Sequence, residues 1–471
     1  MMNKKLLVLA AFIFALNSCS NKSAPIVADP WQEAEAILAR IVAPAFPDKD
    51  FNVLDFGAKG DSITDCTDAF AKAILACYEA GGGRVVVPEG KFSTGAIHLK
   101  SNVNLHVSKG AKILFSRDPS KYLPQVYTRF EAVELMNYSP LIYAYEQENI
   151  AITGEGELDG QADDDHWWYW KGKWGHAGVT RQARENHQKA ANERLKKMAE
   201  DGVPVSERIF GEGDYLRPSF VQPYKCKNVL IEGVTIKDSP MWVIHPVLSE
   251  NVTIRNVTVI SHGPNSDGCD PESSKDVLIE GCVFDTGDDC IAIKSGRDHD
   301  GRRVNVPSEN IIVRNCTMKD GHGGVVIGSE ISGNVRNVFA ENCEMSSPYL
   351  DRALRLKSNS RRGGIIENVF MRNVTVGDVA DAVVHVYMFY ANETGDNYPV
   401  VRNIQVKNVT SKKSDYGIYI EADEEYPVEG IYIEDCSFDN VAKGNQLKGY
   451  KDLALKNVKV NGEQVESSEN R

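Results

Sequence analysis

The chain has 471 residues, of which 42% are hydrophobic and 25% are charged. These fractions are typical of a globular protein and exclude a disordered or collagen-like chain. Acidic residues outnumber basic residues by 66 to 53, which gives a formal net charge of -13. Nucleic-acid binding depends on clustered cations, so we expect no nucleic-acid partner. If the ligand is an anion, its site must carry its own local positive charge.

The amino terminus has the pattern of an export signal. An uninterrupted apolar run from Leu6 to Leu16 follows two lysines. A run of this length is typical of a signal peptide and is too short to span a membrane as a helix. Leu16-Asn17-Ser18-Cys19 then resembles a bacterial lipobox, in which the Cys becomes the lipidated first residue. We therefore expect residues 1–18 to be a lipoprotein signal peptide, with an ordinary secretory signal as the alternative. Cys19 would anchor an exported, periplasm-facing bacterial lipoprotein to the membrane, because no acidic run follows it to signal surface export.

Two helices are predicted before the main body of the chain. Residues 19–47 form a tether with a short helix around Trp31–Ile41. The apolar spacing of Thr67–Tyr78 predicts a second helix, which Gly81-Gly82-Gly83 ends. A helix at this place would cap the open amino end of a stacked β structure, whose exposed edge otherwise invites pairing.

A nine-residue phrase recurs through the rest of the chain, as in Asn228-Val-Leu-Ile-Glu-Gly-Val-Thr-Ile236. Apolar and polar residues alternate, turn at Gly or Asn, and alternate again, which predicts a strand, a bend and a strand with one buried face. One such unit cannot cover its own apolar face, so stacked units predict a solenoid over residues 48–462, with a tail at 463–471. The phrases begin at Asn228, Asn251, Asp276, Asn310, Asn337, Asn368, Asn403, Gly430 and Asp452.

The seventh place of the phrase is either Val or Cys, as in Val257 and Cys282. This exchange predicts an interior position and makes these cysteines buried small hydrophobic residues instead of ligands or disulfide partners. The recurring Asn-Val-Thr resembles a glycosylation sequon at Asn251, Asn373 and Asn408. Because this Asn-Val-Thr sequence falls on the repeat, we interpret its asparagines as turn residues whose side chains form hydrogen bonds with the backbone.

Residues 161–218 interrupt the repeats. This insertion contains four tryptophans, Trp167, Trp168, Trp170 and Trp174, and a charged helical run over Arg181–Glu200. Two interpretations stay open, namely a solvated surface helix and an aromatic wall at one end of a carbohydrate cleft. The run Asp163-Asp164-Asp165 has the residues for a calcium site, but a solvated loop is the more common role of such a run.

The internal alignment of the repeats brings charged residues of successive coils to one place. Asp288 and His322 both lie twelve residues past the start of their phrase, so they should occupy neighbouring rungs about 4.8 Å apart. Aligning Cys269 with Cys290 brings Asp267 beside Asp288. Aligning Lys357-Ser358 with Lys294-Ser295 brings Arg355 and Lys357 to the same face. A hydrophobic core needs no such column, although Asp residues can also form a polar ladder that satisfies turns.

The residue types in this column indicate a hydrolytic reaction. Glycoside hydrolysis needs a protonated carboxyl that donates to the leaving oxygen and an ionised carboxylate that activates water or attacks the sugar. Asp267, Asp288 and Asp289 could supply both. A neutral sugar would not require Arg355 and Lys357, whereas a carboxylate on the substrate would. A uronic-acid polymer is therefore the candidate substrate, with no cofactor and no metal.

The same residues carry a resemblance to glycoside hydrolase family 28, the polygalacturonases. The family motifs Asn-Thr-Asp, Gly-Asp-Asp, Gly-His-Gly and Arg-Ile-Lys are similar to Asn265-Ser266-Asp267, Gly287-Asp288-Asp289, Gly321-His322-Gly323 and Arg355-Leu356-Lys357. The resemblance implies a right-handed parallel β-helix and an inverting hydrolysis of α-1,4-linked galacturonic acid. It implies Asp288 as general acid, Asp267 and Asp289 as activators of water, and His322 as the group that tunes their protonation. Arg355 and Lys357 would hold the galacturonate carboxylate, with Asn265 and Tyr390 beside the reacting sugar. For Tyr390 the alternative is a buried tyrosine of the core.

Within the family, the long insertion and Ser295-Gly296-Arg297-Asp298 look more like bacterial and plant exo-acting members than fungal endo enzymes. We expect the insertion, Arg297, Arg302 and Arg303 to close one end of the cleft and hold a terminal sugar, with a solvated basic loop as the alternative. Three other functions stay open: a rhamnogalacturonan or pectic-side-chain hydrolase, a calcium-dependent pectate lyase, and a non-catalytic glycan-binding β-helix.

Overall fold

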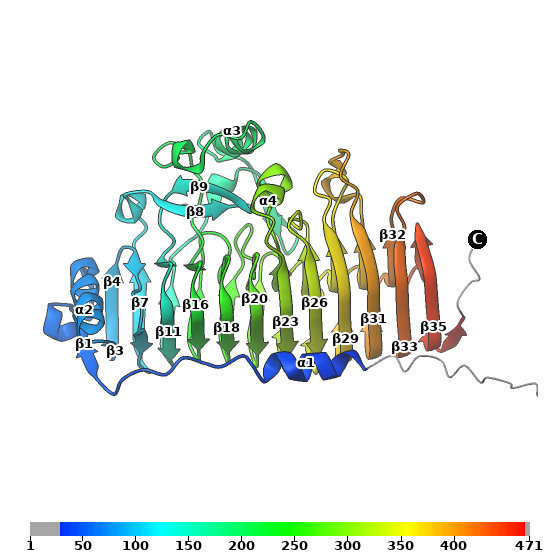
Figure 1. Ribbon diagram of the computed structural model, residues 1–471, viewed down its shortest axis with the longest axis horizontal. Helices are drawn as coiled ribbons and strands as arrows, with labels where there is room; N and C mark the ends of the chain where they lie inside the picture. Colours follow the sequence, from blue (N-terminus) through cyan, green and yellow to red (C-terminus); the bar gives the residue numbers. More distant parts are fainter. Residues whose placement is uncertain (1–28, 467–471) are drawn as a thin grey trace, which may run out of the picture.

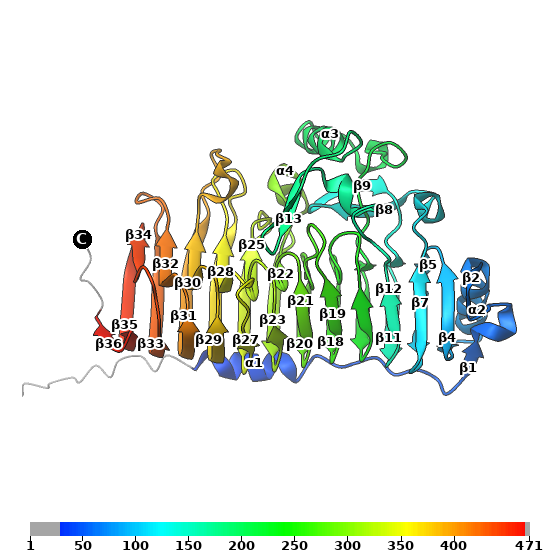
Figure 2. The same cartoon turned by 180° about the vertical axis from the view of Figure 1, so that it is seen from behind.

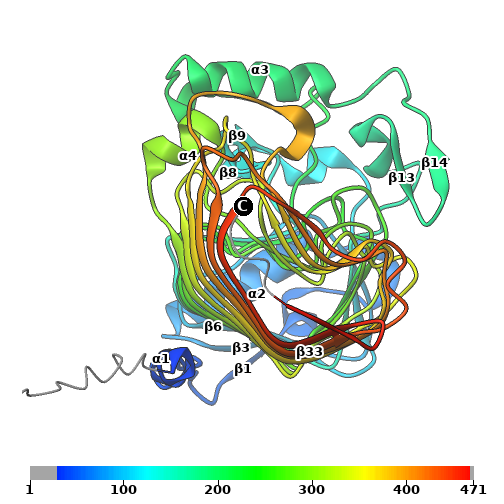
Figure 3. The ribbon, with the colours of Figure 1, turned by 90° about the vertical axis from the view of Figure 1, so that its right-hand side faces the viewer.

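The computed structural model describes residues 29–466, which fold into one long solenoid (Figure 1). The predicted signal peptide and Cys19 lie outside the described residues. Successive strands stack in parallel along the solenoid axis, and Figure 3 shows the coils superimposed when the molecule is viewed along that axis. The predicted right-handed parallel β-helix is confirmed. Within residues 29–466, none of the helices combines the length and the hydropathy that a membrane span requires.

Three stacks of parallel strands form the faces of the solenoid. The first face consists of β1 (Asp50–Asn52), β3 (Gly83–Val87), β6 (Val103–Val107), β11 (Glu148–Gly154), β16 (Lys227–Glu232), β18 (Glu250–Arg255), β20 (Lys275–Glu280), β23 (Ser308–Arg314), β26 (Val335–Glu341), β29 (Ile365–Asp378), β31 (Val400–Lys413), β33 (Val428–Phe438) and β35 (Tyr450–Val460). The second face consists of β2 (Asp61–Asp65), β4 (Gly90–Thr94), β7 (Ala111–Phe115), β12 (Glu157–Asp159), β17 (Thr235–Lys237), β19 (Thr258–Ser261), β21 (Val283–Thr286), β24 (Thr317–Met318) and β27 (Glu344–Met345), and continues in the second half of β29.

The third face carries the functional column. Its strands are β5 (Ile97–His98), β10 (Ile142–Tyr145), β15 (Val221–Tyr224), β22 (Ile291–Ile293), β25 (Val325–Gly328), β28 (Arg352–Lys357), β30 (Ala382–Tyr387), β32 (Tyr416–Glu421) and β34 (Gln446–Lys448). Figure 2 views the molecule from the side opposite to Figure 1 and shows β22, β25, β28 and β30 in succession. Single bridges through Ile244 and Cys269 join its amino-terminal strands to β22. The short strand β36 (Glu463–Val465) pairs antiparallel with β35 at the carboxyl end.

The repeat places the predicted residues in the interior. The Val and Cys residues of the seventh place are all at most 2% exposed, and Cys282 and Cys316 are unpaired thiols in the main core. The repeat asparagines form ladders with one another, and Asn251 also binds the backbone of Val42 as expected. The Asn251 side-chain amide donates to Asn228 at 2.7 Å, and Asn408 donates to Asn373 at 2.8 Å. These residues have positive φ angles, which asparagine tolerates better than most residues do, so the ladders mark the bends.

The amino-terminal helices cover two different parts of the solenoid. Helix α1 (Pro30–Leu38), shorter than the predicted Trp31–Ile41, lies along the outside of the first face (Figure 1). It packs Ala34 and Ile37 on an apolar row made by Leu278, Ile312, Phe339 and Phe370. Helix α2 (Thr67–Glu79) covers the amino end of the stack, as predicted, and buries Phe70 and Ile74 in the main core.

The insertion and a hairpin that the repeat analysis missed form a second, smaller core. Helix α3 begins at Lys189 and ends at Glu200, so the first half of the predicted run at Arg181 is not helical. Ala191 and Leu195 of α3 pack with residues of the antiparallel hairpin β8 (Val126–Phe130) and β9 (Val133–Asn137). Helix α4 (Asp298–Val304) lies beside this hairpin (Figure 1). Helix α3 is therefore a surface helix, as one of the two interpretations held, with its outer side exposed and its inner side packed on the hairpin and the solenoid.

The tryptophans of the insertion are mainly structural. Trp167 and Trp170 are 2% and 5% exposed and belong to the main core. The Trp168 indole donates to the carbonyl of Ser239 at 2.9 Å, and Trp174 lies in the small hairpin β13 (Trp174–His176) and β14 (Val179–Arg181). The buried rings at Trp167 and Trp170 cannot stack on a sugar, so an aromatic wall made of these two residues is wrong.

The interior position of Cys316 leads to a test of the repeat. Cys316→Val should change the free energy of unfolding by less than about 1.5 kcal/mol, because Val fills the same place in other coils. Cys316→Asp should cost about 3 kcal/mol or more, because it buries an unpaired charge. Urea denaturation followed by circular dichroism measures both. Equal effects of the two substitutions would contradict an apolar interior at this place.

Candidate active site

A pocket with about 630 Å³ of open space lies against the third face, where β22, β25 and β28 follow one another. Acidic and basic side chains alternate around it. The lining consists of Glu131, Lys171, Trp242, Asn265, Asp267, Asp288, Asp289, Lys294, Arg297, Ser329, Glu330, Lys357, Arg362, Tyr390, Ala391 and Glu393.

Three carboxylates meet at this pocket, as the alignment predicts. Asp288 and Asp289 lie in the turn between β21 and β22, and the Gly268 amide donates to the Asp289 carbonyl at 3.0 Å. This bond places the turn that carries Asp267 on the adjacent rung. One oxygen of each carboxylate lies within 4.8 Å of the other two. Three negative charges this close would repel one another strongly in a buried place.

Cations flank the carboxylates on both sides. The Lys294 ammonium lies 3.2 Å from Asp267, and the Lys357 ammonium lies 2.6 Å from Asp289. Arg355 lies 3.3 Å from the other oxygen of Asp289. In the sheet register Lys294, Gly328 and Lys357 occupy successive rungs. Gly328 has a positive φ of 101°, and a side chain there would collide with the backbone of Lys357, so glycine is required for the close approach of these two rungs.

The surroundings make the three carboxylates unequal. Burial raises the pKa of Asp267 to about 7, and the neighbouring aspartates add to this shift against the opposing charge of Lys294. Burial would also raise the pKa of Asp288, but the charge and hydrogen bond of His322 outweigh it and hold the pKa below its ordinary value. Burial at Asp289 is likewise outweighed by Lys357 and Arg355, which lower its pKa. Of the three carboxyls, Asp267 is therefore the one that takes up a proton most readily around neutral pH.

His322 occupies the rung after Asp288. Its Nδ1 lies 3.0 Å from an Asp288 oxygen, which confirms that the two residues are neighbours. The charge of Asp288 raises the pKa of His322 to about 9, despite the opposing effect of burial. Near neutral pH the imidazolium therefore donates a hydrogen bond to an ionised Asp288.

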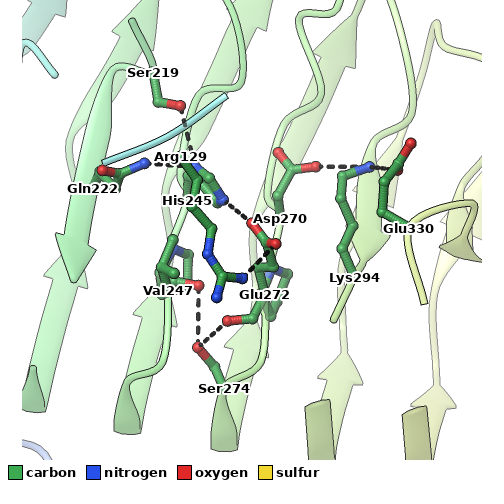
Figure 4. Close-up of polar contacts among 12 residues, drawn as sticks. Arg129, Ser219, Gln222, His245, Val247, Asp270, Glu272, Ser274, Lys294 and Glu330 are labelled. Carbon is green, nitrogen blue, oxygen red and sulfur yellow. Dashed lines mark hydrogen bonds and ion pairs between the residues drawn. The ribbon is translucent and has the colours of Figure 1, made fainter. Parts of the chain in front are cut away.

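Lys294 is the centre of a buried charge cluster that the sequence analysis did not identify. Figure 4 shows its ammonium between Asp270 and Glu330, at 3.3 Å and 3.8 Å. The same group lies 4.6 Å from the centre of the Trp242 ring. The sequence did carry a signal for this role of Lys294. Its alignment with Lys357 places the Lys294 ammonium on the outer side of the third face, where the active site lies.

A second buried network lies beside this cluster (Figure 4). His245 Nε2 lies 2.7 Å from Glu272, and Arg129 of β8 lies 2.6 Å from the other oxygen of Glu272. All three side chains are at most 1% exposed. The network ties the β8–β9 hairpin to the solenoid and so holds in place the hairpin tip, which reaches the pocket at Glu131.

Two of the predicted substrate-binding residues, Asn265 and Tyr390, lie at the pocket. Asn265 lines the pocket and accepts a hydrogen bond from the buried Arg217 at 2.8 Å. Tyr390 also lines the pocket, with its ring centre 5.1 Å from the Lys357 ammonium and 5.7 Å from the Arg355 guanidinium. Tyr390 is half-buried, so it is not a core residue.

Arg297 lies in the pocket wall, whereas Arg302 and Arg303 do not. Arg297 is 7% exposed and its NH1 atom lies 3.1 Å from Glu131 and 3.7 Å from Glu330. Arg302 instead donates to the backbone carbonyls of residues 361 and 362, and Arg303 pairs with Asp300 and Glu134. The expectation that Arg302 and Arg303 contact the substrate is therefore not supported by their positions, since both side chains connect α4 to neighbouring segments.

Two groups of side chains in the described part of the chain have the donor types of a metal site. One is the carboxylate group itself, but the ammonium groups of Lys294 and Lys357 already balance its charge and would repel a further cation. The other consists of His176, His262 and Asp320, which lie on the insertion hairpin and on two turns of the solenoid.

The acidic run of the insertion has local partners instead of a shared centre. Asp163 pairs with His166 at 2.7 Å, Asp164 pairs with Arg181 at 2.7 Å, and Asp165 pairs with Arg184 at 2.8 Å. These pairs favour the loop interpretation of the run over a calcium site.

The contact between His322 and Asp288 leads to a prediction about stability. Because folding raises the His322 pKa from its ordinary 6.5 to about 9, the stabilisation is complete below pH 6.5 and is lost as pH rises through about 9. The difference in thermal midpoint between wild type and His322→Gln should therefore shrink between about pH 6.5 and 10. Differential scanning calorimetry measures it, with His299→Gln, on an exposed part of α4, as the control. A pH-independent difference would argue against the ion pair.

Comparison with known proteins identifies the family. The model of "Glycosyl hydrolases family 28" matches residues 211–462, which include every strand of the carboxylate column. A second model, "Rhamnogalacturonase A/epimerase, pectate lyase-like", matches residues 51–106 at the amino end of the solenoid.

Individual proteins with the same architecture agree with the family match. The chain is 29% identical to an exo-poly-α-D-galacturonosidase of Dickeya chrysanthemi, covering 88% of this chain and 75% of that protein. It is 28% identical to a probable polygalacturonase of Vitis vinifera, covering 84% and 75%. The crystal structure of a hyperthermoactive exopolygalacturonase from Thermotoga maritima superimposes with a TM-score of 0.88 at 51% identity, covering 92% of this chain and 96% of that one. This chain, with its column of carboxylates on a parallel β-helix, belongs to family 28 of the glycosyl hydrolases.

Proposed function

We propose that this protein is an exo-acting polygalacturonase, which hydrolyses α-1,4-linked galacturonic acid in pectin. The observation that carries the proposal is the group of three carboxylates, two buried and one half-buried, with Arg355 and Lys357 on its border. The carboxylates supply an acid and a base for hydrolysis. The two cations supply recognition of an acidic sugar. The Thermotoga and Dickeya relatives, which carry exopolygalacturonase names, support the same substrate.

In this mechanism Asp288 donates a proton to the leaving oxygen, while Asp267 and Asp289 orient and deprotonate the attacking water. In the free site Asp267 has the raised pKa and Asp288 the lowered one, so substrate binding must shift protonation toward Asp288. A galacturonate carboxylate would do so by neutralising Lys357, whose charge lowers the pKa values of Asp288 and Asp289, and Arg355, whose charge lowers that of Asp289. Binding of the acidic sugar is thereby coupled to the protonation that the reaction requires.

The stereochemical outcome rests on the family resemblance alone. Inverting glycosidases usually separate their two carboxyl groups by about 6.5–9.5 Å, which leaves room for water. Here one oxygen of each carboxylate lies within 4.8 Å of the others. We propose inversion because the motifs match those of an inverting family.

The exo mode is supported by what closes the pocket. Glu131 at the tip of the β8–β9 hairpin and Lys171 of the insertion line the pocket together with Arg297. Lys196 of α3 lies 3.5 Å from Glu131 and so connects the insertion helix to this wall. A polymer could not pass through a wall made of packed ion pairs, so a chain end would enter instead.

The competing functions have weaker support. A rhamnogalacturonan hydrolase would make less use of Arg355 and Lys357 together. A calcium-dependent lyase would need a cation site, and each carboxylate of the acidic run Asp163-Asp164-Asp165 already has a basic partner. A non-catalytic glycan-binding protein would have no need of three clustered carboxylates.

Digestion of polygalacturonate tests the proposal. Wild type should release short products from the beginning without a ladder of intermediate oligomers, and proton NMR should detect the β-anomer first. Asp288→Asn should lower kcat by about 10²–10⁴-fold, as expected for removal of a general acid. A ladder of oligomers would rule out the exo mode, and an initial α-anomer would rule out inversion. An unsaturated product absorbing in the ultraviolet would favour the lyase, and full turnover by Asp288→Asn would remove the assigned acid.

We further propose that the protein is a membrane-anchored, periplasm-facing lipoprotein, on the evidence of the lipobox-like sequence that ends at Cys19. Expressed in a bacterial host, the full chain should partition with the membrane fraction and carry the mass of a diacylglyceryl group on Cys19. Cys19→Ser should move it to the aqueous fraction. An aqueous distribution of the unmodified wild type would contradict the anchor.

A further inference from the structure

The third face continues beyond Arg355 and Lys357 for further coils. In the sheet register His385 of β30 follows Arg355, and Tyr419 of β32 follows His385. Tyr387 follows Lys357 in the same way. Rungs are about 4.8 Å apart, so Tyr419 lies roughly 10 Å from the position of Arg355 along the solenoid.

These side chains are on the outer side of the sheet. Side chains alternate along a strand, and Val384, Val386, Ile418 and Ile420 belong to the buried core. His385, Tyr387 and Tyr419 therefore project from the same surface as Arg355 and Lys357. Arg355 and Lys357 in turn reach Asp289, so this surface is continuous with the active site.

The three residues form one aromatic group. The rings of His385 and Tyr419 are stacked, with centres 4.9 Å apart and planes 15° apart. The Tyr387 ring lies 6.0 Å from His385 and 6.4 Å from Tyr419. Tyr387 and Tyr419 are half-buried, so part of each ring is accessible. These rings offer a flat apolar surface on the outside of the sheet, and the apolar face of a pyranose ring has the right shape and chemistry to cover it.

His385 gives an independent indication of a ligand. Its side chain is 7% exposed, and its buried Nδ1 has no hydrogen-bond partner among the described residues. Burial, Arg352, Arg355 and Lys357 lower its pKa to about 2, so the imidazole is neutral at physiological pH. A buried nitrogen without a partner is costly, and a sugar hydroxyl could satisfy it.

We propose that His385, Tyr387 and Tyr419 form a sugar-binding subsite for the residue of the polymer that follows the one held by Arg355 and Lys357. The ring of that residue would lie on the tyrosines, and one of its hydroxyls would bind Nδ1 of His385. This inference rests on the proposed function, because it assumes that the pocket holds the chain end and that the polymer continues toward the carboxyl-terminal coils.

Oligomers of different length test the subsite. We place the sugar held by Arg355 and Lys357 on the leaving side of the cleaved bond, so the subsite takes the third residue from the chain end. A dimer of galacturonate is then too short to reach it, whereas a tetramer is long enough. We expect Tyr419→Ala and Tyr387→Ala to lower the ratio of kcat/KM for tetramer to kcat/KM for dimer by about three- to ten-fold, the range expected for one lost aromatic contact. Tyr419→Phe keeps the ring and should keep the ratio. Tyr432→Ala, which removes a 48% exposed tyrosine from β33 on the first face, is the matched control.

The outcomes separate the subsite from the proposed function. Thermal unfolding of each variant establishes that it is folded, and the two tyrosine variants provide independent readings of the same ratio. If wild type hydrolyses both oligomers and both Ala variants leave the ratio unchanged, the subsite is refuted while the proposed function stands. If wild type hydrolyses neither oligomer, the proposed function fails and the subsite fails with it.

Discussion

The active site depends on the compensation of buried negative charge by ammonium groups on neighbouring rungs. Asp267, Asp288 and Asp289 would each lose several kcal/mol of hydration on burial, and their mutual repulsion would add to that loss. Lys294 on one side and Lys357 on the other restore the balance, at 3.2 Å and 2.6 Å from the nearest carboxylates. A parallel β-helix suits this arrangement because the stacking of its strands holds equivalent residues of successive coils one rung apart.

The same compensation makes the site responsive to an acidic ligand. The cations that keep Asp289 ionised are also the groups best placed to bind a carboxylate, so a bound uronic sugar would weaken their hold on the aspartates. His322 acts in the same electrostatic group, since it is charged and pairs with Asp288. Protonation of the carboxylates, binding of the sugar and the chemistry proposed for the site therefore depend on one set of interactions.

The selectivity of the pocket comes from segments outside the repeat. The β8–β9 hairpin and the insertion share a small apolar core that includes Leu195 and Phe130, and they meet the solenoid through the buried pairs of Arg129 and Arg208. This packing places Glu131 and Lys171 at one end of the pocket. On the opposite side, the aromatic residues of β30 and β32 extend the binding face along the solenoid. The molecule thus combines a closed end with an open, aromatic continuation.

The sequence by itself determined the coils and the carboxylate column, because a repeat of strand, bend and strand permits only one register in which the apolar places face inward. Asp288 and His322 could be aligned for that reason alone, whereas Asp267 and Lys357 also needed the local matches of Cys269 with Cys290 and of Lys357-Ser358 with Lys294-Ser295. Only the tertiary structure decided where the insertion lies, because its segments do not repeat and have no internal alignment. It also decided that Trp167 and Trp170 are core residues, that Arg297 reaches the pocket while Arg302 does not, and that Asp267 is the carboxyl of the three whose pKa is raised. Those outcomes depend on burial and on charges contributed by segments distant in the sequence, which no local pattern records.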